Sequence, residues 1–317
     1  MDVYFYEVFE EESDELQKRI GKKFSYVMTS QTIQEKGDVK FTAKLISIRT
    51  QSKIPIDWVG NIDGVLSRST GYDHLIEFKQ KVKEPIHLGY LEEYATRAVA
   101  EHAILLLMAL LRKLPKQQNQ FVKFERDGLT GSEVKGKNLL VVGVGRIGSE
   151  IVKIGKALGM DVRGVDIVPN KRSVHYVSKI KGVKWADIII CAMNLTAKSI
   201  GYFNYDFLKK SNRGSIFVNI ARGEHAPLVD LLRLIQEGHI GGVGLDVYED
   251  ESLLAVGLRS GGDDDQLRVV HQLLEFPNVV CTPHNAFNTR EAVERKSEMT
   301  IKQIEHFLEL KCFKWEL

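Results

Sequence analysis

The stretch of sequence that decides the fold is Leu139-Leu140-Val141-Val142-Gly143-Val144-Gly145-Arg146-Ile147-Gly148. Its apolar residues predict a buried strand, and the GxGxxG spacing follows that strand directly and opens a helix. Gly143 permits a tight turn, Gly145 lets the backbone approach a pyrophosphate, and Gly148 lets helix and strand pack closely. The amino end of the helix offers N–H groups to phosphates. The stretch therefore predicts a dinucleotide site; the alternative is a glycine-rich turn without a ligand.

An acidic residue at the end of the next strand favours NAD as the dinucleotide. The strand expected over residues 161–165 is followed by Asp166, whose carboxylate can accept hydrogen bonds from both ribose hydroxyls of NAD and would repel the 2′-phosphate of NADP. Lys171 and Arg172 follow closely and would weaken that preference. We therefore expect NAD as the cofactor.

Outward from this motif, the chain alternates strand-like and helix-like segments, which is typical of α/β folds with parallel sheets. Before the motif, a helix is expected over 95–114, ended by Pro115. After the motif, residues 257–266 are expected to form a flexible acidic loop and 289–310 a helix. Further strands are expected over 3–8, 24–28, 44–48, 64–66, 187–192, 215–221, 242–247 and 278–282. The fold class predicted is α/β with two doubly wound parallel-sheet domains.

Three charged residues follow three of the later strands. Arg222 comes after the strand at 215–221, Glu251 after that at 242–247, and His284 after that at 278–282. Parallel sheets bind ligands at the carboxyl ends of their strands, so these side chains are expected to converge beside the nicotinamide. An arginine fork suits a carboxylate and ketone, a histidine can donate and accept a proton, and a carboxylate orients it. Alternatively, Arg222 is a surface residue, Glu251 part of an acidic loop and His284 a helix cap.

Composition limits the other function classes. A chain of 317 residues is long enough for two domains, and its net charge of +2 gives no field that favours nucleic acid or an anionic membrane. The apolar run 103–111 is too short to span a bilayer, and no secretory leader is recognisable at the start, so a cytoplasmic location is expected. Cys191, Cys281 and Cys312 lack metal-ligand spacing, and no metal site is predicted. The apolar helix at 98–114 predicts a homodimer through the cofactor domain.

Several stretches, in this order along the chain, resemble the D-isomer-specific 2-hydroxyacid dehydrogenase family, and most closely its D-lactate dehydrogenase branch. Besides 143–148, they are Ser67-Arg68-Ser69-Thr70-Gly71-Tyr72-Asp73-His74, Val99-Ala100-Glu101-His102, Val218-Asn219-Ile220-Ala221-Arg222-Gly223, Gly244-Leu245-Asp246-Val247-Tyr248-Glu249-Asp250-Glu251 and Thr282-Pro283-His284-Asn285-Ala286. The resemblance implies a Rossmann cofactor domain (95–287) inserted in a flavodoxin-like substrate domain (1–94 and 288–317). It also implies hydride transfer between NAD(H) and a small D-2-hydroxy or 2-keto acid, with an active-site cleft that closes on NAD binding.

The resemblance also assigns roles to residues. Arg222 would anchor the substrate, His284 would be the acid/base and Glu251 its partner. The substrate-binding residues would be Thr70, Gly71, Tyr72 and Tyr94, the last of which matches a pocket tyrosine of the D-lactate branch. The cofactor-binding residues would be Gly143, Gly145, Arg146, Ile147, Gly148, Asp166, Thr196, Ala221 and Asp246, with Asp246 near the nicotinamide.

Two departures from the family pattern concern the cofactor site. Two other functions are also considered as alternatives. The chain has Ala192-Met193-Asn194 where the family usually carries a His-x-Pro element, and the link from Asp166 to Asp187 is short. An NAD(H)-sensing regulatory or corepressor protein would keep the same charged residues, and turnover would exclude it. A formate-dehydrogenase-like enzyme would carry an amide at position 251, so Glu251 argues against that function.

Overall fold

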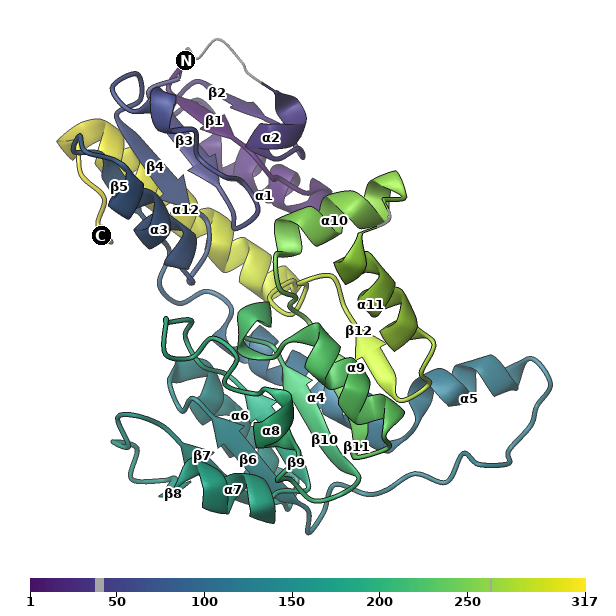
Figure 1. Ribbon diagram of the computed structural model, residues 1–317. Helices are drawn as coiled ribbons and strands as arrows, with labels where there is room; N and C mark the ends of the chain where they lie inside the picture. The colour runs from purple at the N-terminus through teal and green to yellow at the C-terminus, as the bar shows by residue number, and fades with distance from the viewer. Residues whose placement is uncertain (38–42, 263) are drawn as a thin grey trace. The chain divides into compact units, whose positions relative to one another are not determined.

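The computed structural model describes residues 1–37, 43–262 and 264–317, which form two compact units. The first unit combines Met1–Ala95 with Asn288–Leu317, and the second is Thr96–Phe287 (Figure 1). Each unit contains one sheet, of five strands in the first and seven in the second, and all pairings between its named strands are parallel. The predicted fold class, α/β with two parallel sheets, is confirmed.

The five-stranded sheet of the first unit has the order β2-β1-β3-β4-β5. Its core joins the sheet to α2 and α3 through residues such as Tyr6, Ile33, Ile46 and Phe78. The long C-terminal helix α12 packs against α1, and the side chain of Thr289 caps its first turn by accepting from the Ala292 N–H group. The elements are β1 (Val3–Phe5), α1 (Glu10–Ile20), β2 (Tyr26–Met28), α2 (Ile33–Lys36), β3 (Leu45–Ile48), η1 (Ile56–Trp58), β4 (Gly64–Ser67), α3 (Asp73–Lys81), β5 (His87–Gly89) and α12 (Arg290–Leu310).

A cluster of three charged side chains lies fully buried in the first unit. Glu12 Oε1 lies 2.9 Å from Arg68 Nε and 2.8 Å from Lys296 Nζ, and all three side chains are inaccessible to solvent. Arg68 also donates to Ser47 Oγ and to the carbonyl oxygens of Tyr6 and Glu7. One guanidinium therefore ties the end of β4 to β3, to the turn after β1 and to α1. Such a cluster holds its place only while its charges stay paired.

The seven-stranded sheet of the second unit has the order β12-β11-β10-β9-β6-β7-β8. From β6 the chain moves outward to β7 and β8, then returns to the other side of β6 for β9, β10, β11 and β12. The carboxyl ends of β6 and β9 therefore flank the point where the winding direction reverses, which is where such sheets bind ligands. The strands are β6 (Asn138–Val142), β7 (Asp161–Val165), β8 (His175–Tyr176), β9 (Ile188–Cys191), β10 (Ser215–Asn219), β11 (Ile240–Leu245) and β12 (Val279–Cys281).

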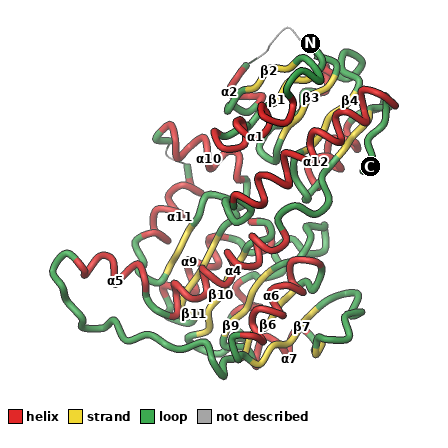
Figure 2. The backbone as a smooth tube through the Cα atoms, turned by 180° about the vertical axis from the view of Figure 1, so that it is seen from behind, coloured by secondary structure: helices red, strands yellow, loops and turns green. Residues whose placement is uncertain are grey.

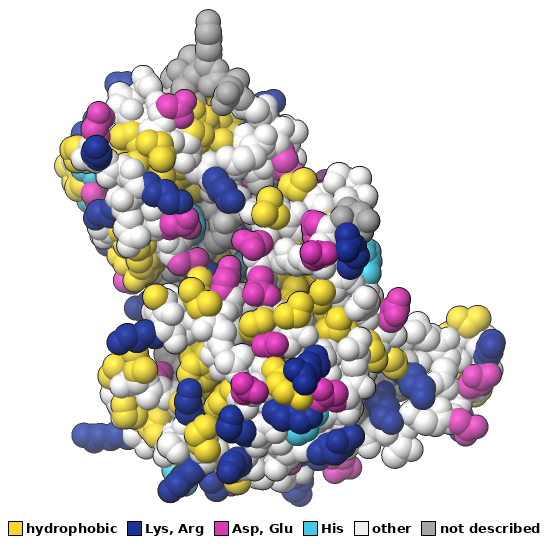
Figure 3. All heavy atoms as spheres, viewed as in Figure 1, with side chains coloured by type: hydrophobic (Ala, Val, Ile, Leu, Met, Phe, Trp, Pro, Cys, Tyr) yellow, Lys and Arg dark blue, Asp and Glu magenta, His cyan; other side chains and the backbone are white. Residues whose placement is uncertain are grey.

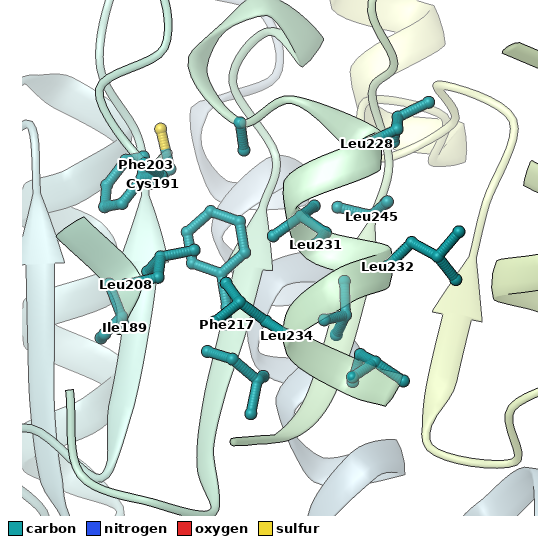
Figure 4. Close-up of a cluster of buried hydrophobic side chains, with 14 of the residues drawn as sticks. Ile189, Cys191, Phe203, Leu208, Phe217, Leu228, Leu231, Leu232, Leu234 and Leu245 are labelled. Atoms are coloured by element: carbon teal, nitrogen blue, oxygen red, sulfur yellow. The ribbon is translucent and has the colours of Figure 1, made fainter. Parts of the chain in front are cut away.

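Helices cover both faces of this sheet (Figures 1 and 2). Helix α4 (Thr96–Leu111) and helix α6 (Arg146–Ala157) pack on one face, while α7 (Lys179–Trp185), α8 (Tyr205–Leu208) and α9 (Leu228–Gln236) cover the other. Helix α6 buries Gly148, Ile151, Val152 and Gly155, the spacing that puts one helical stripe against a sheet. On the second face, Phe217 and Leu245 of the sheet pack against Leu231 and other side chains of α9 (Figure 4).

The helix predicted over 95–114 is present as α4, but it ends before Leu114. Helix α4 ends at Leu111, and α5 (Leu114–Phe121) follows after Lys113, whose φ of 53° is left-handed. The prediction that Pro115 ends a helix is wrong, because Pro115 lies in the first turn of α5, where its missing N–H group costs nothing. Most of α4 is also buried inside this unit, against α6 and strands β10 to β12. Its apolar character therefore reflects the core more than a partner.

The acidic loop predicted over 257–266 is wrong as well. Helix α10 (Glu251–Ser260) continues through Gly257, and α11 (Asp265–Leu274) begins after Asp264, whose side chain caps it; residue 263 lies outside the described part. Leu254 of α10 and Leu267 of α11 are buried, so both helices pack against the core of the second unit. The short strands β5 and β8 were not predicted.

The surface of the molecule agrees with a nearly neutral net charge. On the face seen in Figure 3, basic side chains are interspersed with acidic and apolar ones. Within the described ranges, no helix has the length and apolar character needed to cross a membrane.

Candidate active site

The glycine-rich turn after β6 forms an open cradle. Gly143 has a φ of +89°, and a side chain there would meet the backbone of Ala192 and Met193. A side chain on Gly148 would collide with the Gly143 carbonyl oxygen, whereas a Cβ atom added to Gly145 would point into open space with no contact within 4 Å. Helix α6 begins at Arg146, so its first N–H groups are left without intrahelical acceptors. This geometry fits the pyrophosphate of a dinucleotide at the amino end of α6.

Asp166 lies at the same turn. Its Oδ2 accepts from the Val144 N–H group at 2.5 Å, and its Oδ1 accepts from the Val168 N–H group at 2.8 Å. The carboxylate therefore braces the glycine-rich turn, and each oxygen keeps a second acceptor position. Its place at the end of β7 fits the ribose contact expected for NAD.

The loop that follows β9 carries Thr196, and the turn after β10 carries Ala221. The Thr196 side chain is exposed, and its N–H group donates to Ser199 Oγ at 2.8 Å. Ala221 is buried and its N–H group donates to Asn219 Oδ1. Because β9 and β10 are neighbours in the sheet, both positions lie at its carboxyl edge on the same side of β6.

His284 and Glu251 form a hydrogen-bonded pair at the carboxyl ends of β12 and β11. Nδ1 of His284 lies 2.7 Å and 2.8 Å from the two carboxylate oxygens of Glu251, and both side chains are about one-fifth exposed. Since Nδ1 faces the carboxylate, it carries the proton of that bond, and Nε2 is the nitrogen that can face a ligand. The pair therefore has the geometry of a proton donor held by its partner.

Arg222 follows the neighbouring strand β10, and its segment lies directly against the segment of Glu251. A side chain on Gly223 would overlap the backbone of Tyr248 and Glu249, so only glycine permits this approach. The side chain of Asn219 holds the turn by donating to the Arg222 carbonyl oxygen at 2.8 Å. Because β10, β11 and β12 are consecutive in the sheet, the structure places Arg222, Glu251 and His284 at one edge.

Asp246 holds the loop that carries His284, a role that the sequence did not suggest. Its carboxylate accepts from Thr282 Oγ1 (2.6 Å) and from the N–H groups of Asn285 and Ala286 (2.8 and 2.9 Å), and the residue is 1% exposed. His284 has a φ of 49°, in the left-handed region that residues other than glycine rarely adopt, and these bonds maintain it. The contact of Asp246 with the nicotinamide stays a prediction.

The predicted substrate residues lie in the first unit. Thr70, Gly71 and Tyr72 are in the loop after β4, and Tyr94 lies next to Ala95, where the first segment of this unit ends. Thr70 Oγ1 donates to the Glu92 carbonyl oxygen at 2.7 Å, and Gly71 follows it. Tyr72 precedes α3, is partly exposed and packs on Tyr90 with ring centroids 4.7 Å apart. Tyr94 is buried, and Arg295 donates to its carbonyl oxygen. The structure thus brings the loop of Thr70 against residues 91–92.

Cys191 and Cys281 offer no reactive thiol to this site. Burial raises the pKa of Cys191 to about 12, and it raises the pKa of Cys281. Both side chains are therefore protonated and unreactive at neutral pH. Among the side chains that the structure describes, no three His, Cys, Asp or Glu residues gather in the manner of a metal site.

Comparison with known proteins agrees with this geometry. Residues 104–286 match the family model of the D-isomer specific 2-hydroxyacid dehydrogenase, NAD binding domain. The chain is 32% identical to 2-hydroxyacid dehydrogenase homolog 2 of Schizosaccharomyces pombe, over 77% of this chain and 75% of that protein. It is 31% identical to the aromatic 2-oxoacid reductase of Clostridium sporogenes, over 76% and 74%.

A solved structure resembles the chain over almost its whole length. It is D-lactate dehydrogenase from Aquifex aeolicus complexed with NAD and lactic acid, at 27% identity and a TM-score of 0.85, covering 97% of this chain and 96% of that one. The predicted family, its enzyme class and NAD as the cofactor are confirmed. The chain belongs to the D-isomer specific 2-hydroxyacid dehydrogenase family, NAD-dependent oxidoreductases that act on CH–OH donors.

Proposed function

We propose that the protein interconverts pyruvate and D-lactate with NAD(H). The observation that carries the proposal is the His284–Glu251 pair beside Arg222, at the edge of the sheet that also carries the glycine-rich cradle. An acid/base held by a carboxylate and a bidentate cation are the groups that reduction of a 2-keto acid requires. In this proposal the first unit is the substrate-binding domain.

The three charged residues have separate roles in the reaction. NADH, when bound, supplies the hydride that reduces the carbonyl carbon. The Arg222 guanidinium binds the carboxylate and polarises the ketone, and its planar fork is suited to both oxygens. His284 Nε2 gives its proton to the carbonyl oxygen, so the product is the 2-hydroxy acid. Glu251 favours the imidazolium and holds the ring in place through Nδ1. In the oxidation direction His284 takes the proton back.

The choice of pyruvate over larger keto acids rests on the aromatic side chains of the first unit. Tyr72 and Tyr94 are the predicted pocket residues, together with the backbone N–H groups of Thr70 and Gly71. In this proposal the two tyrosines would surround a small substituent with apolar surface. The alternative is an aromatic 2-oxo acid, the substrate class in the name of the Clostridium sporogenes relative.

A panel of keto acids tests the substrate. NADH oxidation is followed with pyruvate, glyoxylate, hydroxypyruvate, phenylpyruvate and phosphohydroxypyruvate, with NADPH in parallel. The proposal expects the highest kcat/KM with pyruvate and NADH. A higher value with phenylpyruvate would replace pyruvate by the aromatic class. If the whole panel fails while NADH still binds, the NAD(H)-sensing alternative would be favoured.

Replacing Glu251 with glutamine should slow pyruvate reduction by at least about tenfold. The amide can still accept from His284 Nδ1, but it has no negative charge to stabilise the imidazolium. Steady-state kcat for pyruvate reduction measures this; a variant with the wild-type kcat would argue that the charge of Glu251 has no part in the reaction.

We also propose that the protein is a homodimer through the cofactor domain. Because α4 is largely buried, support comes instead from α5 and the residues after it, where Phe121, Val122 and Phe124 are each more than 70% exposed. Apolar groups gathered on one projecting segment are typical of a protein contact, and a second copy is the occupant we expect. The cytoplasmic location stays a prediction.

Changing Phe121 and Phe124 together to serine should convert the dimer into a monomer. The double variant removes two aromatic anchors, which usually carry a large share of the binding energy. Light scattering after size exclusion gives the mass. Val229→Ser, on an exposed apolar position of α9, is the control and should leave the mass unchanged. A wild-type chain that is already monomeric would contradict the proposal.

A further inference from the structure

The side chain of a buried histidine contacts both ends of the loop that follows β9. His225 lies in the short 3₁₀ turn η2 (Gly223–His225), just after Arg222, and is inaccessible to solvent. Its Nδ1 is 3.0 Å from the Ser199 carbonyl oxygen, and its Nε2 is 3.2 Å from the Met193 carbonyl oxygen. One ring therefore spans residues 193–199, which we call the β9 loop.

The two contacts determine the chemistry of the ring. Carbonyl oxygens only accept, so each ring nitrogen has to donate, and a neutral imidazole has one N–H group. Both hydrogen bonds form when the ring is an imidazolium, because both nitrogens then carry a proton. In a neutral ring, one of the two nitrogens has no proton to donate. Apolar side chains of similar size could fill the space of the ring but could replace neither bond.

Backbone bonds join the same two segments. The Gly201 N–H group donates to the Glu224 carbonyl oxygen, and the Phe203 N–H group donates to the His225 carbonyl oxygen, both at 2.8 Å. Inside the β9 loop, Ser199 Oγ accepts from the Thr196 N–H group. The β9 loop and the segment that begins at Arg222 are therefore one connected piece.

The β9 loop also forms a wall of the dinucleotide cradle. A Cβ atom on Gly143 would lie 2.7 Å from Met193 Cα and 2.6 Å from the Ala192 carbonyl oxygen, so Met193 packs directly on the glycine-rich turn. This contact lies between the carboxyl ends of β6 and β9, where the winding direction of the sheet reverses. A displaced Met193 would change the shape of the cradle.

We propose that His225 is a positioning residue that holds the β9 loop in the form that receives NAD and couples it to Arg222. His225 acts through the Met193 and Ser199 carbonyl groups and contacts neither cofactor nor substrate. The effect on cofactor affinity rests only on the NAD site, whereas the coupling to substrate rests on the proposed function.

The test compares two buried histidines in the same unit. His225→Leu removes both donors, and His225→Gln keeps an amide that can donate to one carbonyl. His239→Leu is the matched control, because His239 is also buried, Nε2 has no partner among the described residues, and the residue lies at the amino end of β11. NADH affinity is measured by calorimetric titration, and thermal unfolding is recorded for each variant.

We expect His225→Leu to raise the Kd for NADH by about tenfold, the equivalent of one to two lost hydrogen bonds. His225→Gln should raise it less, and His239→Leu should leave it unchanged even if its melting temperature falls. The KM for NADH should follow the Kd, with a smaller change in kcat. If His225→Leu does not fold, His225→Gln carries the test and must still weaken NADH binding.

Wild-type affinity in a folded His225 variant would overturn the proposal, and so would an equal loss in His239→Leu. The titration needs no turnover. If the wild-type protein reduced no keto acid, the proposed function would fail while the NADH titration still decided the role of His225.

Discussion

Replacing His284 with alanine should lower kcat for pyruvate reduction about 10³-fold, within the range reported for loss of a general acid. The variant keeps Arg222 and the glycine-rich cradle, so the substrate can still be held, but the carbonyl oxygen has to take its proton from water. The Kd for NADH should stay within a small factor of the wild-type value, because His284 is assigned to the proton and not to the cofactor. Stopped-flow turnover and NADH titration separate the two quantities.

The control for this variant is His271→Ala, on the exposed side of α11. It removes the same imidazole from the same unit and should keep the wild-type rate. A His284→Ala enzyme that retained most of its activity would remove His284 from the mechanism. A loss of NADH binding equal to the loss of rate would instead assign the residue to the architecture of the site.

Replacing Glu12 with glutamine should lower the free energy of unfolding by about 3–5 kcal/mol. The change is almost isosteric, yet it leaves the Arg68 guanidinium and the Lys296 ammonium buried without their counter-charge. Burial by itself raises the pKa of Glu12, but Arg68 and Lys296 outweigh it and hold the pKa below its usual range. Burial lowers the pKa of Lys296, so loss of a proton there would limit the damage while Arg68 stays charged.

The sign of the pH dependence follows from the lowered pKa of Glu12. Its contribution is fully present above the unfolded-state pKa, about 4.3, and is lost as the pH falls through the lower folded-state value. The difference in stability between wild type and Glu12→Gln should therefore be largest near neutral pH and narrow below about pH 4. Urea unfolding at pH 7 and at pH 3.5 measures it.

Two further variants make this prediction specific. Glu237→Gln removes a carboxylate whose pKa is also lowered, by hydrogen bonds from Lys209 and Tyr205, but on the surface, so its stability should change little. Lys296→Met removes the second cation and keeps the Glu12–Arg68 pair, so it should cost less than Glu12→Gln. An unchanged Glu12→Gln protein would show that the buried pairing contributes nothing.

The sheet of the second unit and the edge of its site could be predicted because they depend on local patterns. Apolar runs identify the strands, the glycine spacing identifies β6 and α6, and parallel strands place the residues that follow them at one edge. These patterns alone predict Arg222, Glu251 and His284 as the residues of the site. The structure adds that His284 and Glu251 are hydrogen-bonded.

What could not be predicted depends on partners that are distant in the sequence. Glu12, Arg68 and Lys296 belong to residue types that usually lie on the surface, and only the fold buries them together. The groups that donate hydrogen bonds to Asp246 come from the loop that follows the neighbouring strand β12. Nothing in the sequence around His225 indicates that its ring contacts the β9 loop. The helices α10 and α11 were missed because glycine and aspartate in 257–266 outweighed the apolar positions that the structure buries.

Helix α4 shows how a correct observation led to a wrong boundary. Its apolar residues were recognised, but Pro115 can end one helix or lie in the first turn of the next, and the left-handed Lys113 selects the second case. The apolar pattern does not contain the left-handed turn at Lys113 that separates the two helices.

The measurement that tests the central claim most directly is the configuration of the product. The enzyme is incubated with pyruvate and NADH, the consumed NADH is counted, and the lactate is separated on a chiral column. We predict D-lactate alone, in an amount equal to the NADH oxidised. L-lactate, or NADH that binds without any lactate being formed, would contradict the assignment of this site as a D-2-hydroxyacid dehydrogenase that acts on pyruvate.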